Sequence, residues 1–140
     1  LGADHALATP DVDAIVELTG GGAHVSIDAL GSSVTASASI RTLRRRGRHV
    51  QVGLMLADHA DAPLPWGPVI SKELEVVGSH GMAAADYPEL LTMVADGRLD
   101  VGRLIGKVVT LDDAPAELAA MDNLVPATAG LVVATVNGAS

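Results

Sequence analysis

The sequence contains no cysteine and no phenylalanine, and it has one tryptophan and one tyrosine. Without cysteine the chain has no disulfide framework and no thiolate ligand for a metal ion. Because 49% of the residues are hydrophobic, the core is expected to consist of Val, Leu, Ile and Ala. This composition suits a parallel sheet flanked by helices with small side chains better than an aromatic-rich sandwich.

Basic residues are also scarce, and the formal net charge is −8. This excess of acid argues against nucleic acid or an anionic membrane as a partner. The sequence has neither an apolar run near the ~20 residues that span a bilayer nor a signal-peptide pattern at its start. We therefore expect a cytoplasmic protein, and 140 residues are enough for one domain with a real core.

The most informative stretch is residues 23–54, which predicts a strand, a helix and a second strand. The first strand (25–30) runs into Gly31, and the second (49–54) contains Gly53. Neither shows the clean alternation of a half-solvated strand. This is typical of parallel strands buried on both faces, where ligands bind beyond the carboxyl ends.

The helix between these strands is expected to be capped by Ser32 or Ser33 and to end at Gly47. Its predicted buried stripe is Ala36, Ile40 and Leu43. The arginines of this region would then complement the carboxyl end of the helix and stay solvated; they are Arg41, Arg44, Arg45, Arg46 and Arg48.

The remaining elements continue the alternation of helix and strand. An N-terminal helix is expected to start with Thr9 as its N-cap and Pro10 at its first position, and a Pro-rich loop covers 57–68. Further elements are predicted as a strand at 74–78, a helix from the Asp86 cap to 96 with Leu90, Leu91 and Val94 inward, a strand at 104–111, a helix at 113–121 and a strand at 131–136. The fold class is therefore α/β, a partial doubly wound (Rossmann-like) parallel sheet over residues 1–97 followed by a separate segment, 98–140.

In this order the elements resemble the C-terminal half of the zinc-dependent alcohol dehydrogenases of the medium-chain dehydrogenase/reductase family. The segments that carry the resemblance are 1–5, 27–31, 47–53, 75–79 with 87–97, and 106–121 with the final strand. The resemblance implies that residues 98–140 return to a catalytic domain. It also implies a parent enzyme that transfers a hydride between an alcohol and NAD(P), with zinc polarising the alcohol oxygen.

In that family the cofactor lies against three segments that this chain contains. By resemblance, Ala29, Leu30 and Gly31 would line the ribose and pyrophosphate, Val52, Gly53 and Leu54 the nicotinamide ribose and ring, and Gly78, Ser79 and Gly81 the carboxamide. Glycine at such positions lets the backbone approach a ligand closely. Where relatives have a pyrophosphate-binding Arg, this sequence has Thr128-Ala129-Gly130, which puts phosphate contact from this region in doubt.

The zinc ligands, the glycine-rich turn and the residue that selects NAD over NADP belong to the part of the family sequence that is not present here. We therefore expect no catalytic and no metal-binding residue in these 140 residues, and no dehydrogenase turnover by them alone. Residues 4–8 would also lack their neighbouring strands. The resemblance further implies a homodimer formed through the edge strand 74–77.

Two other functions stay open. A zinc-free quinone or enoyl reductase of the same superfamily shares this half of the fold. A non-enzymatic α/β module for oligomerisation or binding is the second alternative, although Asp4 and Lys107 do not match a phosphoacceptor receiver domain.

Several polar residues have a structural and a functional interpretation. Asp28 is expected to be structural, near helix N-termini, and the histidines His5, His24 and His49 to lie at element ends. Asp58, His59 and Asp61 read as a polar loop rather than a metal site. His80 lies in the segment that the resemblance places beside the nicotinamide, where it would tune contacts.

Overall fold

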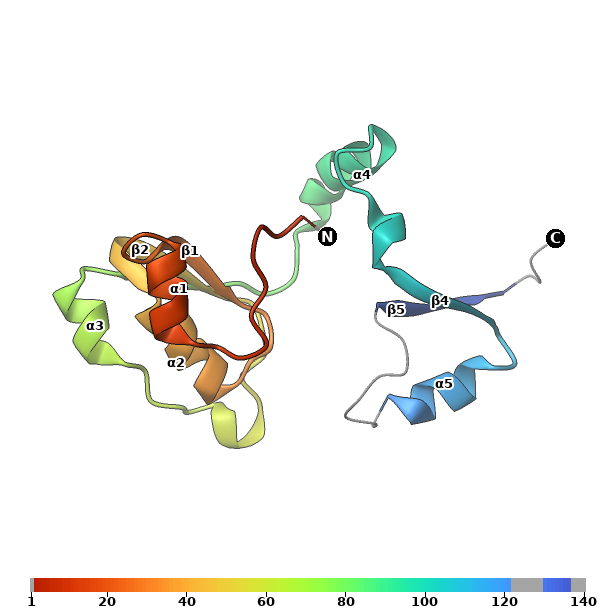
Figure 1. Cartoon of the computed structure of the whole chain (residues 1–140). Coiled ribbons are helices and arrows are strands. Elements are labelled where there is room, and N and C mark those ends of the chain that lie inside the picture. The colour runs from red at the N-terminus through yellow and green to blue at the C-terminus, as the bar shows by residue number, and fades with distance from the viewer. Residues whose placement is uncertain (1, 122–129, 137–140) are drawn as a thin grey trace. The chain divides into compact units, whose positions relative to one another are not determined.

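The computed structural model describes residues 2–121 and 130–136, which form two compact units (Figure 1). The first unit, residues 4–81, holds helices α1 to α3 and a three-stranded sheet. The second unit holds the described residues from Met82 onward with α4, α5 and a two-stranded sheet, together with residues 2 and 3.

The sheet of the first unit is fully parallel, in the order β1-β2-β3. The strands are β1 (Ala23–Asp28), β2 (Leu43–Gln51) and β3 (Glu75–Gly78). Helices α2 (Ser33–Arg41) and α3 (Trp66–Ser71) form the two crossovers, and because both crossovers advance in the same direction, right-handed connections place both helices on one face. Both α1 (Val12–Leu18) and α3 contact α2. The predicted α/β fold with neighbouring parallel strands is confirmed.

The two faces of this sheet differ sharply in polarity. Ser26 and Asp28 of β1 lie on the helix-covered face, together with His49 of β2. The His49 ring is hydrogen-bonded to Ser39 of α2. The alternate positions Val25 and Ile27 are 55% and 62% exposed. The expectation that the strands are buried on both faces is therefore wrong for the described residues: the polar side of β1 is covered and its apolar side is open.

The boundary between α2 and β2 lies several residues before the predicted one. The helix ends at Arg41 with Thr42 as its C-cap, and Leu43, 0% exposed, starts the strand. Gly47, predicted as the helix end, lies inside β2. An apolar stripe with spacings of four and three cannot show whether its last member belongs to the helix or to the strand that follows.

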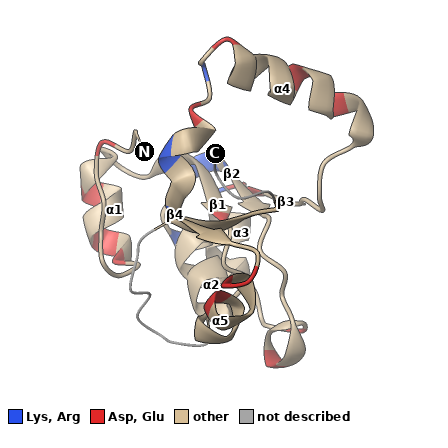
Figure 2. Ribbon diagram, turned by 90° about the vertical axis from the view of Figure 1, so that its right-hand side faces the viewer, with Lys and Arg blue, Asp and Glu red and all other residues tan. Residues whose placement is uncertain are grey.

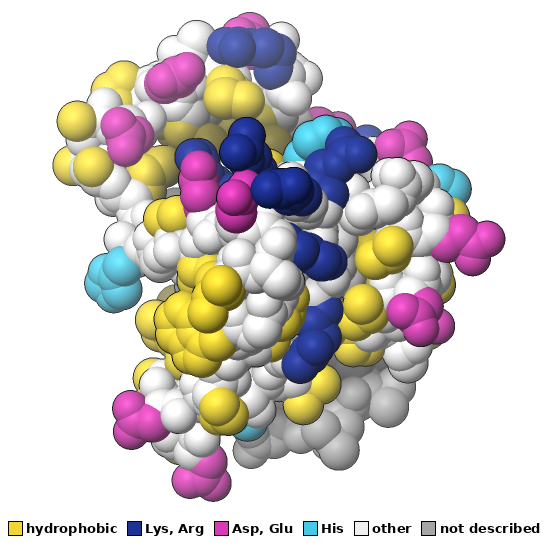
Figure 3. Space-filling view, turned by 90° about the vertical axis from the view of Figure 1, so that its left-hand side faces the viewer, with side chains coloured by type: hydrophobic (Ala, Val, Ile, Leu, Met, Phe, Trp, Pro, Cys, Tyr) yellow, Lys and Arg dark blue, Asp and Glu magenta, His cyan; other side chains and the backbone are white. Residues whose placement is uncertain are grey.

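The arginines therefore lie mostly on a strand and not at the end of a helix. Between the register pairs Ala23↔Leu43 and Val25↔Arg48, β2 holds more residues than β1, so the register shifts there as at a β-bulge. Arg46, at the bulge, has φ 59°, and its Nε donates to Glu73 Oε2 at 3.0 Å. Figure 3 shows Lys and Arg side chains in a row on one face of the molecule. Figure 2 shows acidic residues on several parts of the chain, among them α1, which holds Asp13 and Glu17.

Two helix starts also differ from prediction. The N-cap of α1 is Asp11 and not Thr9, because the Asp11 carboxylate accepts from the Ala14 amide at 3.0 Å. The predicted loop 57–68 contains the 3₁₀ turn Ala57–His59 and the start of α3. Its prolines did not exclude a helix, because Pro is tolerated in the first turn.

The second unit follows the predicted element order. It contains α4 (Tyr87–Ala95), β4 (Ile105–Thr110), α5 (Ala114–Ala120) and β5 (Leu131–Thr135), with β4 and β5 parallel. Asp86 is the N-cap residue of α4, as predicted, although its side chain makes no capping hydrogen bond and a 3₁₀ turn (Ala84–Asp86) precedes the helix. The prediction that Leu91 points inward is wrong, because its side chain is 62% exposed. Thr128 and Ala129, predicted as a departure from the family, lie outside the described residues.

Candidate functional site

Three loops leave the sheet of the first unit at neighbouring points of one edge. Asp28 pairs with Gln51 and Gln51 pairs with Gly78, so β1, β2 and β3 end side by side. The Ser79 amide continues the ladder by donating to the Gln51 carbonyl at 2.9 Å. The structure thus gathers all three predicted segments, 29–31, 52–54 and 78–81, at the carboxyl edge of parallel strands.

The first two segments pack directly against each other. The Asp28 carbonyl accepts from the amides of Val52 at 2.9 Å and Gly53 at 2.8 Å. A Cβ on Gly31, where φ is +84°, would lie 2.3 Å from the Leu54 carbonyl oxygen, and a Cβ on Gly53 would lie 2.3 Å from the Gly31 nitrogen. Both glycines are therefore required for the close approach of the two turns, whatever else they contact.

The third segment is open. A Cβ on Gly78 or on Gly81 would meet no atom within 4 Å. Gly81 has φ +63°, whereas Gly78 has an ordinary strand conformation that any residue can adopt. Leu30 and Leu54, 74% and 59% exposed, present apolar side chains from the other two segments.

Asp28 holds the first turn together. Its Oδ1 accepts from the amides of Leu30 at 3.0 Å and Gly31 at 3.2 Å and from the Thr35 hydroxyl at 3.1 Å. Its Oδ2 accepts from Gln51 Nε2 at 2.9 Å. The structural interpretation of Asp28 is supported, since the 4%-exposed carboxylate faces the start of α2 and its charge is compensated there.

Gln51 and His49 extend this network along β2. Gln51 Nε2 also donates to the Gly53 carbonyl at 2.9 Å, and Gln51 Oε1 lies 3.2 Å from His49 Nε2. His49 Nδ1 lies 3.2 Å from Ser26 Oγ and 3.1 Å from Ser39 Oγ. His49 is 1% exposed and lies within the strand, so the expectation that it occupies an element end is wrong.

The network keeps the Asp28 carboxyl ionised. Burial, the largest single influence, raises its pKa, but the hydrogen bonds from Gln51, Gly31, Leu30 and Thr35 together lower the pKa below its ordinary value. Asp28 therefore places a negative charge directly before the first turn, residues 29–31.

Sequence reasoning missed Gln51, Thr35 and the serines as members of this site. A signal was present: Ser26 and Asp28, like His49 and Gln51, occupy alternate positions of their strands. Such a period of two places all four side chains on one face of a parallel sheet. The pattern shows that the four side chains share a polar face, but it does not show that a helix covers this face.

Other predicted polar residues lie apart from this network. His59 Nδ1 accepts from the Ser33 amide at 3.4 Å, which attaches the 57–59 turn to the start of α2. His80 is exposed in the third segment. Among the described residues, the structure has no group of three or more His, Asp or Glu side chains that could hold a metal ion.

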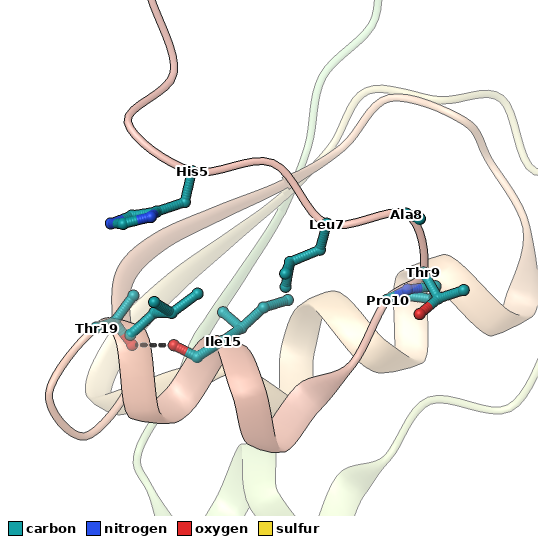
Figure 4. A pocket seen from close by; sticks show the side chains of 8 residues that line it. His5, Leu7, Ala8, Thr9, Pro10, Ile15 and Thr19 are labelled. Atoms are coloured by element: carbon teal, nitrogen blue, oxygen red, sulfur yellow. Dashed lines mark hydrogen bonds between the residues drawn. The ribbon is translucent and has the colours of Figure 1, made fainter.

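Among the hollows of the described residues, two are mainly apolar and contain none of the predicted site residues. One of about 510 Å³ lies between residues 5–10 and α1 and is lined by Leu7, Pro10 and Ile15 among others (Figure 4). The other, about 570 Å³, lies between α5 and the β4–β5 sheet. Their lining is mainly apolar and brings together no set of titratable groups. No helix of the described part is long and apolar enough to cross a membrane.

The aligned carboxyl ends of parallel strands, connected by helices, are the place where open α/β sheets bind their ligands. Residues 1–96 match the family model described as zinc-binding dehydrogenase, and the chain belongs to this family. The resemblance to the medium-chain dehydrogenases is thereby confirmed.

Individual relatives agree. The chain is 30% identical over 117 residues to sorbitol dehydrogenase of Halalkalibacterium halodurans, a match that covers 81% of this chain and 34% of that protein. It is 35% identical over 95 residues to D-xylulose reductase A of Aspergillus niger, covering 68% and 26%. The crystal structure of 2R,3R-butanediol dehydrogenase from Bacillus subtilis superimposes with a TM-score of 0.71 at 27% identity, covering 84% and 33%. The chain thus spans about a third of the length of the relatives it matches.

Proposed function

We propose that this chain forms one wall of the dinucleotide site of an NAD(P)-dependent dehydrogenase that oxidises an alcohol or polyol. The observation that carries the proposal is the alignment of segments 29–31, 52–54 and 78–81 at one sheet edge, with open space beside Gly78. The family match supports it, and the names of the relatives point to polyols as the substrate class.

The described residues suit a dinucleotide better than a metal ion. The exposed side chains of Leu30 and Leu54 offer apolar contact to a ribose or a nicotinamide face, and the backbone of 78–81 offers hydrogen-bonding groups without side-chain obstruction. When bound, the dinucleotide would supply hydride acceptance. The chain's own contribution would be to orient it and to shield it from water on one side.

Zinc does not fit the described residues, since no set of ligands is gathered among them. We assign zinc, the glycine-rich turn and the substrate pocket to a part of the polypeptide outside this sequence, and we derive no step through the metal. A zinc-free reductase of the same superfamily is the alternative, and zinc content distinguishes the two. Homodimerisation through β3 and a cytoplasmic location belong to the same proposal.

Gly78→Val tests the proposal in the polypeptide as its source produces it. The valine side chain enters empty space in an allowed backbone conformation, so the fold is expected to persist. If the cofactor occupies that space, the Kd for NADH, followed by nicotinamide fluorescence, should rise at least tenfold.

Gly67→Val is the matched control, because it introduces the same side chain at a glycine that also has no atom within 4 Å of a new Cβ but lies in α3. It should leave NADH binding unchanged. Equal affinities of Gly78→Val and wild type would contradict the proposal.

A further inference from the structure

We infer that Asp28 and Gln51 act together as positioning residues that hold the two cofactor-facing turns, 29–31 and 52–54, in a fixed relation. The inference rests on the proposed function, since it assigns the buried Asp28 and the half-buried Gln51 a role in binding a dinucleotide that they do not touch.

The hydrogen bonds determine the orientation of every member of the network. Ionised Asp28 has acceptors only, so the atom of Gln51 at 2.9 Å from Oδ2 must be the amide nitrogen. The same nitrogen donates to the Gly53 carbonyl. A single amide group thus ties the carboxylate of the first turn to the backbone of the second.

The orientation of Gln51 in turn determines the tautomer of His49. Because Gln51 Nε2 faces Asp28, Gln51 Oε1 faces His49 and accepts from it. The ring of a neutral His49 then carries its proton on Nε2, and Nδ1 accepts from the hydroxyl of Ser26 or Ser39. The His49 tautomer therefore reports the state of the Asp28–Gln51 pair.

Asp28→Asn reverses this arrangement. The remaining carbonyl oxygen of residue 28 stays with the Leu30 and Gly31 amides, so its new NH₂ group faces Gln51 donor to donor. Gln51 turns its amide over, His49 must accept at Nε2, and its proton moves to Nδ1. The Gly53 carbonyl then faces the Gln51 oxygen and loses its donor, which displaces the second turn.

The test measures the ¹⁵N shifts of the His49 ring in the polypeptide as its source produces it. The wild type should show the Nε2–H form, and Asp28→Asn the Nδ1–H form. Gln51→Met, which removes the link but leaves the carboxylate, should show a mixture of both forms. Asp61→Asn, a control at an exposed loop carboxylate, should match the wild type. An Nδ1–H form in the wild type, or wild-type shifts in Gln51→Met, would overturn the inference even if Asp28→Asn fails to fold.

The second readout is the Kd for NADH of the polypeptide as its source produces it. Asp28→Asn and Gln51→Met should each raise it about tenfold, while Asp61→Asn should not. A tautomer change with unaltered NADH affinity would overturn this inference and leave the proposed function standing. A wild-type protein that binds no NADH would overturn the proposed function, and with it this inference.

Discussion

The glycines that follow the strands have two different roles: some are required for the packing of the turns, and one is free to contact a ligand. A side chain on Gly31 or Gly53 would collide with the backbone of the other turn, whereas a side chain on Gly78 would meet open space. Loss of cofactor binding after substitution therefore means different things at these positions. At Gly31 or Gly53 it would report a disturbed fold, and at Gly78 a ligand contact.

Gly53→Ala should destabilise the chain by about 3 kcal/mol, because the new methyl group overlaps the Gly31 backbone and two turns must move apart. Gly78→Ala should change the free energy of unfolding by less than about 0.5 kcal/mol. Urea denaturation of both variants checks this. Equal stability of the two would show that the turns do not approach as described.

Asp28 is expected to make a contribution to the free energy of unfolding that is lost in acid. Its pKa in the folded state lies below the ordinary value of about 3.9 that it has when unfolded, so folding favours the ionised form. The contribution is fully present above that ordinary value and is lost as the pH falls through the lower folded-state pKa. Unfolding free energies measured from pH 6 downward should decline below about pH 4.

Asp28→Asn should remove that part of the decline and cost about 1–3 kcal/mol at neutral pH, because buried donors lose a charged acceptor. Asp61→Asn, at an exposed side chain, provides the comparison. Parallel acid profiles for wild type and Asp28→Asn would contradict the network.

The order of the elements could be predicted from the sequence, but some of their boundaries could not. The strand end at Gly78 and the cap Ser32 follow from local chemistry, and Ser32 Oγ does accept from the Thr35 amide at 3.1 Å. The α2–β2 boundary depends on Leu43, which is buried whether it extends the helix or begins the strand. Tertiary pairing with Ala23 decides for the strand.

Strand β3 is an edge strand of the described sheet, and it carries the predicted dimer contact. Because the Ser79 amide donates to β2, alternation points the Val76 amide to the open edge. Val76→Pro should remove a hydrogen bond to a second copy and convert a dimer to a monomer, whereas Val76→Ala should stay dimeric. Light scattering at micromolar concentration measures both, and a monomeric wild type would contradict the dimer.

At the scale of the whole molecule, the position of the candidate site was predictable and its interior was not. Three strand-end segments were predicted from the resemblance, and the register brings their starting points together. The hydrogen-bonded pair Asp28–Gln51 could not be predicted, because sequence patterns show which residues share a face but not which of them pair across the sheet.

The described chain also leaves its apolar sheet face open at Val25 and Ile27 and gathers no metal ligands. We therefore expect the purified 140 residues to show no alcohol-dependent reduction of NAD, measured as absorbance of NADH with zinc present. Measurable turnover would show that the chemistry resides in this segment after all.

A backbone-amide NMR map during NADH addition tests the central claim most directly. In the polypeptide as its source produces it, shifts within this sequence should concentrate at residues 29–31, 52–54 and 78–81. Perturbations centred on the hollow beside α1, or none within this sequence, would contradict the assignment of the sheet edge as a dinucleotide-binding wall.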